Sequence, residues 1–138
     1  MLEGAKILII DHDVTFIDQL ISQLDRTRAT TSWLPDNKCA MGRIENMRPD
    51  IIVLNVNIPG FDPLLILDQV KQYYPLIEVI LLTEQSSIND VIPGLKRGAV
   101  DYLQKPVDME TLISKICNAY QKKLRQHEKI DRFKRFLV

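Results

Sequence analysis

Unbroken apolar runs along the chain predict buried β-strands. Three of them show no alternation of apolar and polar positions: KILII at 6–10, IIVL at 51–54 and VILLT at 79–83. Such runs are typical of strands buried on both faces, as in a parallel sheet covered by helices. A shorter run, VDYL, follows at 100–103. The weaker segment TTSWL at 30–34 does alternate, so we expect it nearer an edge of the sheet.

Capping residues predict where the first three intervening helices begin. Asp13 and Asp36 are candidate N-caps for the first and second helices, and Asp62 followed by Pro63 is a typical start for the third. The expected helices span about 14–24, 37–47 and 63–73. The first of them has its apolar residues at i, i+3 and i+4 spacing, namely Phe16, Ile17, Leu20, Ile21 and Leu24.

Two more helices are predicted in the C-terminal half. The fourth starts at Ser86 or Ser87, and Pro93 within it removes a helical hydrogen bond, so we expect this helix to be short or irregular. The fifth starts at Asp108, with inward residues Leu112, Ile113, Ile116 and Tyr120. Five strands that alternate with five helices indicate an α/β fold with a doubly wound parallel sheet and right-handed crossovers.

Polar residues follow four of the predicted strands, at the point where each strand ends. They are Asp11, His12 and Asp13 after the first, Asn55 and Asn57 after the third, Thr83 and Glu84 after the fourth, and Lys105 with Pro106 after the fifth. In an open parallel sheet, ligands bind at the carboxyl ends of the strands. We therefore expect a site at this edge. The alternative is that these residues are polar only because loops begin there.

Four segments in this order resemble the receiver domains of bacterial two-component response regulators. They are ILIIDHD, PDIIVLNVNIPGFD, VILLT and RGAVDYLQKP, and the resemblance covers residues from about 5 to 120. It implies a flavodoxin-like fold with strand order 2-1-3-4-5, and a receiver-like domain over 1–120. It also implies a cis bond between Lys105 and Pro106, since the family's Lys-Pro bond is usually cis.

The resemblance implies a role for each residue of the site. Family members hold magnesium with an acidic pair and a carbonyl, and they accept a phosphoryl group on an aspartate. A hydroxyl and a lysine contact that group, and an aromatic residue changes rotamer on activation. By position, the acidic pair falls on Asp11 and His12, the acceptor on Asn55, the carbonyl on Asn57, the hydroxyl on Thr83, the lysine on Lys105 and the switch aromatic on Tyr102.

Two departures from the family pattern determine the expected function. The amide nitrogen of Asn55 is a very poor nucleophile because its lone pair is delocalised, so we expect no phosphorylation there. With His12 and Asn55 in place of carboxylates, the pocket charge falls from about minus three to about minus one, so magnesium binding should be weak or absent. The sequence therefore predicts a degenerate receiver with no catalytic residue and no cofactor, which signals by binding protein partners.

The retained residues allow two interpretations. Thr83, Tyr102 and Lys105 could serve a two-state switch driven by another signal, with His12 as a pH-sensitive element. The interpretation we favour is that they fill the old pocket, with Lys105 paired to Asp11.

An enzymatic alternative rests on the string DHDVT. It matches the D-x-D-x-T motif of haloacid-dehalogenase-type phosphohydrolases, with Asp11 as nucleophile and Asp13 as general acid/base. The late acidic pair of that family is missing, however, and the motif does not account for NVNIPGFD.

Charge is unevenly distributed, although the chain as a whole is neutral. Residues 121–138 hold seven basic residues and two acidic ones, in a segment that continues the fifth helix without Gly or Pro. We expect a linker leading to an output domain beyond Val138; a coiled-coil arm or a basic face for an acidic partner are alternatives. No recognition-helix unit accompanies this charge, so direct nucleic-acid binding is not expected.

The remaining expectations concern partners and location. Homodimerisation or partner docking is expected through the fourth helix, the fifth strand and the fifth helix, by analogy with the family. Cys39 and Cys117 are far apart and outside any C-x-x-C pattern, which favours reduced, packed thiols. The longest early apolar run is too short for a signal peptide or membrane span, so we expect a cytoplasmic protein.

Overall fold

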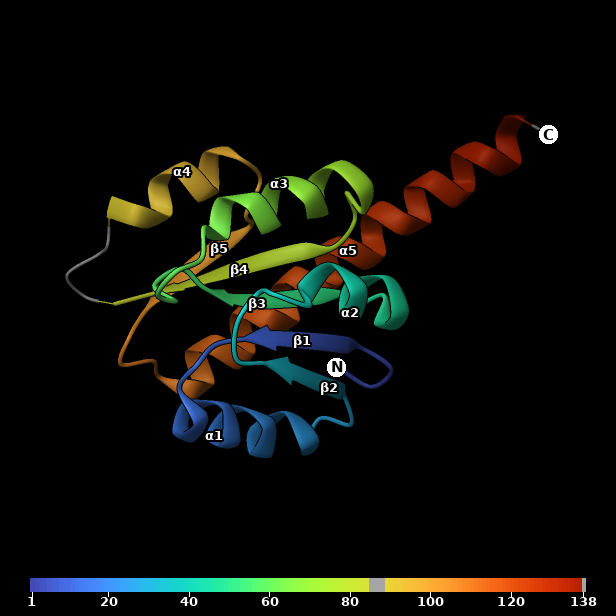
Figure 1. Ribbon diagram of the computed structural model, residues 1–138. Coiled ribbons are helices and arrows are strands. Elements are labelled where there is room, and N and C mark those ends of the chain that lie inside the picture. Colours follow the sequence, from blue (N-terminus) through green and yellow to red (C-terminus); the bar gives the residue numbers. More distant parts are fainter. Residues whose placement is uncertain (85–88, 138) are drawn as a thin grey trace.

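A computed structural model describes residues 1–84 and 89–137 and confirms the predicted parallel sheet (Figure 1). The strand order is β2-β1-β3-β4-β5, and all neighbouring strands pair in parallel. The strands are β1 (Lys6–Ile10), β2 (Thr30–Leu34), β3 (Ile51–Asn55), β4 (Glu78–Thr83) and β5 (Asp101–Gln104). As predicted, the alternating segment forms the edge strand β2, whereas every residue of β3 and β4 is buried.

Helices cover both faces of the sheet. They are α1 (Val14–Asp25), α2 (Ala40–Met47), α3 (Pro63–Tyr73), α4 (Val91–Lys96) and α5 (Met109–Leu137). α1 and α5 pack on one face, and α2, α3 and α4 pack on the other (Figure 1). Successive residues of a strand point to opposite faces, so Leu8 and Ile10 pack under the second group of helices while Ile7 and Ile9 pack under α1 and α5. Because helices cover both faces of the sheet, the buried part of β1 is an unbroken run of apolar residues.

Two of the predicted caps are confirmed. The Asp13 side chain accepts a hydrogen bond from the backbone N–H of Phe16 (3.1 Å), which fixes the start of α1 directly after β1. The Asp62 side chain accepts from the N–H of Leu64 (2.9 Å), and Pro63 occupies the first position of α3. These contacts satisfy helix N–H groups that have no partner within the helix.

The predicted cap of the second helix is wrong. Asp36 accepts a hydrogen bond from the backbone N–H of Lys38 (2.9 Å), and α2 begins only at Ala40, with Cys39 at the cap position. An aspartate that bonds to the N–H two residues further on forms a turn, and this local bond competes with helix capping. The expectation of packed thiols also fails for Cys39, which is exposed, whereas Cys117 is half-buried and its pKa is raised by burial.

The C-terminal half agrees with the sequence where the structure describes it. Ser86 and Ser87 lie outside the described residues, but α4 is short, as Pro93 predicted. α5 begins after Asp108 and buries Leu112 and Ile116. It then continues to Leu137 and projects beyond the rest of the molecule (Figure 1). No helix within the described ranges is long and apolar enough to cross a membrane.

Leu67 and Leu65 lie on different faces of α3 and offer a matched test of this packing. Leu67 is fully buried, whereas Leu65 is 61% exposed. We expect Leu67→Ala to lower the free energy of unfolding by about 2–5 kcal/mol, because it leaves a cavity in the core. Leu65→Ala should change it by less than about 0.5 kcal/mol. Urea denaturation followed by circular dichroism measures both, and equal losses would contradict this packing.

Candidate functional site

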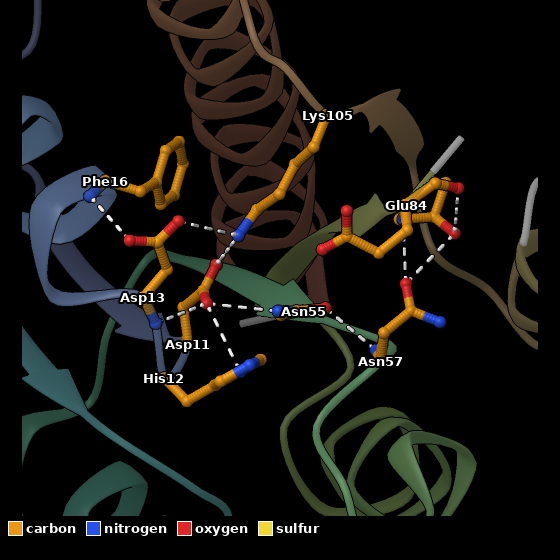
Figure 2. Close-up of polar contacts among 9 residues, drawn as sticks. Asp11, His12, Asp13, Phe16, Asn55, Asn57, Glu84 and Lys105 are labelled. Atoms are coloured by element: carbon orange, nitrogen blue, oxygen red, sulfur yellow. Dashed lines mark hydrogen bonds and ion pairs between the residues drawn. The ribbon is translucent and has the colours of Figure 1, made fainter. Parts of the chain in front are cut away.

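The loops that follow β1, β3, β4 and β5 bring the predicted polar residues to one edge of the sheet (Figure 2). The strands run in parallel and in register, with Ile10 beside Leu54 and Leu54 beside Leu81, so their carboxyl ends meet there. Polar side chains from four separate segments therefore contact one another.

A single buried carboxylate is at the centre of this network. Asp11 has no exposed surface, and its Oδ2 lies 2.8 Å from Nζ of Lys105. Its Oδ1 accepts hydrogen bonds from Nδ2 of Asn55 and from the backbone N–H of Asp13, both at 3.0 Å. Both oxygens of Asp11 therefore have partners. This matters because an uncompensated charge in such a buried position would be very costly.

The side-chain amide of Asn55 connects Asp11, which follows β1, to the polar residues at the end of β4. Its side chain is 1% exposed, and its Oδ1 accepts from the backbone N–H of Asn57 (2.8 Å). Oδ1 of Asn57 in turn accepts from the backbone N–H of Glu84 (2.8 Å) and from the hydroxyl of Thr83 (3.3 Å). The carboxylate and the two amides thus form one continuous chain of hydrogen bonds across the sheet edge (Figure 2).

Lys105 closes the site from the β5 side. Only 10% of its side chain is exposed, and its Nζ lies 3.9 Å from Oδ2 of Asp13 and 4.6 Å from the ring centroid of Phe16. A cation above an aromatic face is attracted by the ring quadrupole. The peptide bond between Lys105 and Pro106 is cis, as predicted. An open cavity of 510 Å³ adjoins this lysine and is lined by Asp13, Phe16 and Glu84, among others.

The sequence assigned Phe16 to the core and did not predict its contact with Lys105. The available signal was its position in the first turn of α1, three residues after the cap Asp13, which directs it towards the site. His12 and Tyr102 lie at the periphery of the site. The His12 side chain is 50% exposed, with Nδ1 3.7 Å from Oδ1 of Asp11, and Tyr102 is 37% exposed on β5.

The site geometry and strand order agree with a known family. A family model described as the response regulator receiver domain matches residues 7–117. The chain belongs to this family. The phosphohydrolase alternative is not supported, because the receiver-domain model accounts for the chain from residue 7 to residue 117.

Named relatives match this receiver domain over only part of their own length. The DNA-binding transcriptional regulator NtrC of Salmonella typhimurium is 26% identical over 123 residues, which is 87% of this chain and 26% of NtrC. The response regulator MprA of Mycobacterium sp. (strain KMS) is 31% identical over 112 residues, which is 81% of this chain and 49% of MprA. The chain therefore spans at most about half the length of these relatives.

Solved structures confirm the flavodoxin-like receiver fold. NtrX from Brucella abortus matches with a TM-score of 0.85 at 25% identity, over 93% of this chain and 29% of that one. The receiver domain of NtrX alone gives a TM-score of 0.77 at 26% identity, over 83% of this chain and 98% of that one. A CheY-like receiver domain from Methanospirillum hungatei gives 0.82 at 21% identity, over 90% of this chain and 99% of that one, which supports the fold alone.

The contact between Asp11 and Lys105 predicts a non-additive pair of substitutions. Lys105→Met alone should lower the free energy of unfolding by about 3 kcal/mol, because it leaves a buried carboxylate without its cation. Lys105→Met combined with Asp11→Asn should be more stable than Lys105→Met alone, because no buried charge remains. Urea denaturation of the two variants beside the parent measures the difference. Equal or greater loss in the double variant would show that the ion pair is not what stabilises this edge.

Proposed function

We propose that this receiver domain signals through protein contacts and is not phosphorylated at the family's acceptor position. The observation that carries the proposal is Asn55, which stands at the end of β3 with both ends of its amide engaged. Its nitrogen donates to Asp11, and its oxygen accepts from Asn57. A nucleophile needs an available lone pair, and the nitrogen of this amide has none.

The neighbouring side chains do not fit a magnesium ion. Mg²⁺ favours octahedral sites in which one or two carboxylates and several waters supply oxygen ligands. Here the one buried carboxylate, Asp11, already pairs with Lys105, and His12 adds an imidazole in place of a second carboxylate. Within residues 1–84 and 89–137, no group of three or more His, Cys, Asp and Glu side chains is arranged to hold a metal.

The same contacts favour a filled pocket over a phosphate-driven switch. In the family, the equivalent lysine contacts the phosphoryl group, whereas Lys105 is paired 2.8 Å from a carboxylate that is fully buried. Moving Lys105 to meet another ligand would leave Asp11 without its cation, which is costly in a buried site. We therefore assign Asp11, His12, Asn55, Thr83 and Lys105 to a degenerate phosphoacceptor pocket.

Intact mass spectrometry tests the loss of the acceptor. After incubation with Mg²⁺ and a small-molecule phosphodonor, we expect the wild type to gain no phosphoryl group. The double variant His12→Asp, Asn55→Asp restores two carboxylates and should gain one.

Asn55→Ala is the matched control, since it removes the amide without adding a nucleophile. A phosphoryl group gained by this variant would have to lie on a residue other than residue 55. A phosphorylated wild type would contradict the proposal, and peptide mapping would then locate the modified side chain.

The partner surface that we propose comprises α4, β5 and the exposed side of α5. Ile92 and Tyr102 are large apolar residues on this surface, 47% and 37% exposed. Asp101, next to Tyr102 in β5, forms an ion pair with Lys115 of α5 (2.7 Å). Apolar side chains surrounded by charged ones are typical of a docking surface. The basic segment after residue 120 would connect this domain to an output module; the relative NtrC is described as a DNA-binding transcriptional regulator.

Light scattering coupled to size-exclusion chromatography tests self-association through this surface. We expect the mass of the wild type to rise with concentration towards that of a dimer. Ile92→Glu should shift the association to higher concentration, because it places a charge in the apolar part of the contact. Leu65→Glu on α3 is the control, since Leu65 is also exposed but lies outside the surface. A wild type that is monomeric at the highest concentration would argue against the homodimer.

A further inference from the structure

A second hollow lies at the amino-terminal ends of the strands, opposite the degenerate pocket. It is a groove of 480 Å³ between the distal part of α5 and the loops that precede β3 and β4. We call the less exposed lining residues Pro49, Tyr74 and Ile77 its floor, Ile130 of α5 its wall, and the exposed, charged Arg48 and Lys134 its rim. We call this hollow the basal groove.

Ion pairs hold α5 in the position that forms the basal groove. Lys123 pairs with Asp50, which directly precedes β3. The next contact is between Nζ of Lys122 and Oε2 of Glu78 (3.6 Å), at the start of β4. Glu78 is only 2% exposed and lies 3.9 Å from Nζ of Lys71 on its other side. Glu78 is thus a buried carboxylate with a lysine on each side, and together with the pair between Lys123 and Asp50 it holds α5 against the starts of β3 and β4. The groove is therefore already shaped before any ligand binds.

The basal groove combines an apolar floor with uncompensated positive charge. The side chain of Lys134 makes no hydrogen bond or ion pair with any described residue. Arg48 stacks over the ring of Tyr74, 4.7 Å from its centroid, and bonds only a backbone carbonyl, so its guanidinium keeps free donors. The one acidic residue in the lining, Asp131, is 3.5 Å from His127. A ligand that fits must therefore supply apolar surface and negative charge together.

We propose that the basal groove binds an acidic peptide segment of a partner protein, anchored by a large apolar side chain. The anchor would pack on Tyr74, Ile77 and Ile130, and the carboxylates beside it would meet Arg48 and Lys134. A guanidinium that is already held by an aromatic ring pairs with a carboxylate at little further entropic cost. The volume is within the range of pockets that bind ligands in other proteins.

A second copy of this chain fits the basal groove less well. Beyond Ile130, the large exposed apolar residues on the distal part of α5 are Phe133, Phe136 and Leu137, and they stand among Arg132, Lys134 and Arg135. Inserting this segment from another copy would bring cations against a cationic rim, which is repulsive. This inference does not depend on the state of Asn55, because the two sites lie at opposite edges of the sheet.

A labelled peptide provides the first test. The probe is a fluorescein-labelled peptide with one leucine and one phenylalanine among glutamates, and its partner is the same peptide with both apolar residues replaced by alanine. Fluorescence anisotropy with the full chain should show saturable binding of the first peptide and much weaker binding of the second. Amide NMR shifts on binding should centre on Leu76, Ile77 and Ile130.

Matched charge reversals on α5 separate a specific site from general attraction. Lys134→Glu should weaken binding about tenfold, since it replaces a charge-assisted contact by repulsion. Lys129→Glu makes the same charge change on an exposed residue outside the groove and should leave the affinity within about twofold of the wild type. Ile130→Glu should abolish binding by removing the apolar wall.

Four results with the peptide and the variants would overturn the proposal, and a fifth comes from lipid vesicles. They are equal weakening by Lys129→Glu and Lys134→Glu, equal binding of the alanine peptide, NMR shifts centred on the Asp11 edge, or displacement of the peptide by rising concentrations of the chain itself. Binding of anionic phospholipid vesicles that is lost in Lys134→Glu, with no binding of the peptide, would point to a membrane surface and would also overturn it.

Discussion

The buried charge of Asp11 sets the constraint on which the candidate site depends. A carboxylate with no exposed surface needs a cation and hydrogen-bond donors, and Lys105 and Asn55 supply them. Because Lys105 follows β5 and Asn55 ends β3, this requirement connects distant segments of the sheet edge. The contacts at Asn57, Thr83 and Glu84 extend the connection to β4. The polar edge is thus one unit, in which a change at one residue alters the surroundings of the others.

The two ends of the sheet differ in how their charged side chains are paired. At the carboxyl ends, positive and negative groups of the chain satisfy one another within the degenerate pocket. At the opposite edge, Glu78 and Asp50 use Lys122 and Lys123 to orient α5, while Lys134 at the rim of the basal groove has no partner among the described residues. At the carboxyl ends, Lys105 pairs with Asp11, whereas the basal groove presents positive charge that has no partner among the described residues. This contrast supports a domain that works by contacts with other proteins.

Much of the fold could be predicted because strands buried on both faces leave an unambiguous apolar run, and all five strands were placed to within one residue at each end. The start of α2 could not be predicted, because Asp36 accepts a hydrogen bond from the N–H of Lys38, and only the structure shows which local bond forms. The convergence of Asp11, Asn55 and Lys105 followed from the parallel sheet. The individual hydrogen-bond partners of these residues could not be predicted from the sequence, since the orientation of the Asn55 amide depends on Asn57 and Asp11 together. The basal groove left no signal in any one segment, because its lining comes from loops and a helix far apart in the chain.

The most direct test of the account is a Mg²⁺ titration of the isotope-labelled chain, followed by the amide NMR signals of Asp11, Asn57 and Glu84. A pocket filled by its own ion pair and amides should show no saturable shift at these signals in the wild type. The variant His12→Asp, Asn55→Asp should show one, because it restores two anionic oxygen ligands. A saturable shift in the wild type at similar Mg²⁺ concentrations would contradict the claim that Lys105 and Asn55 have closed the pocket.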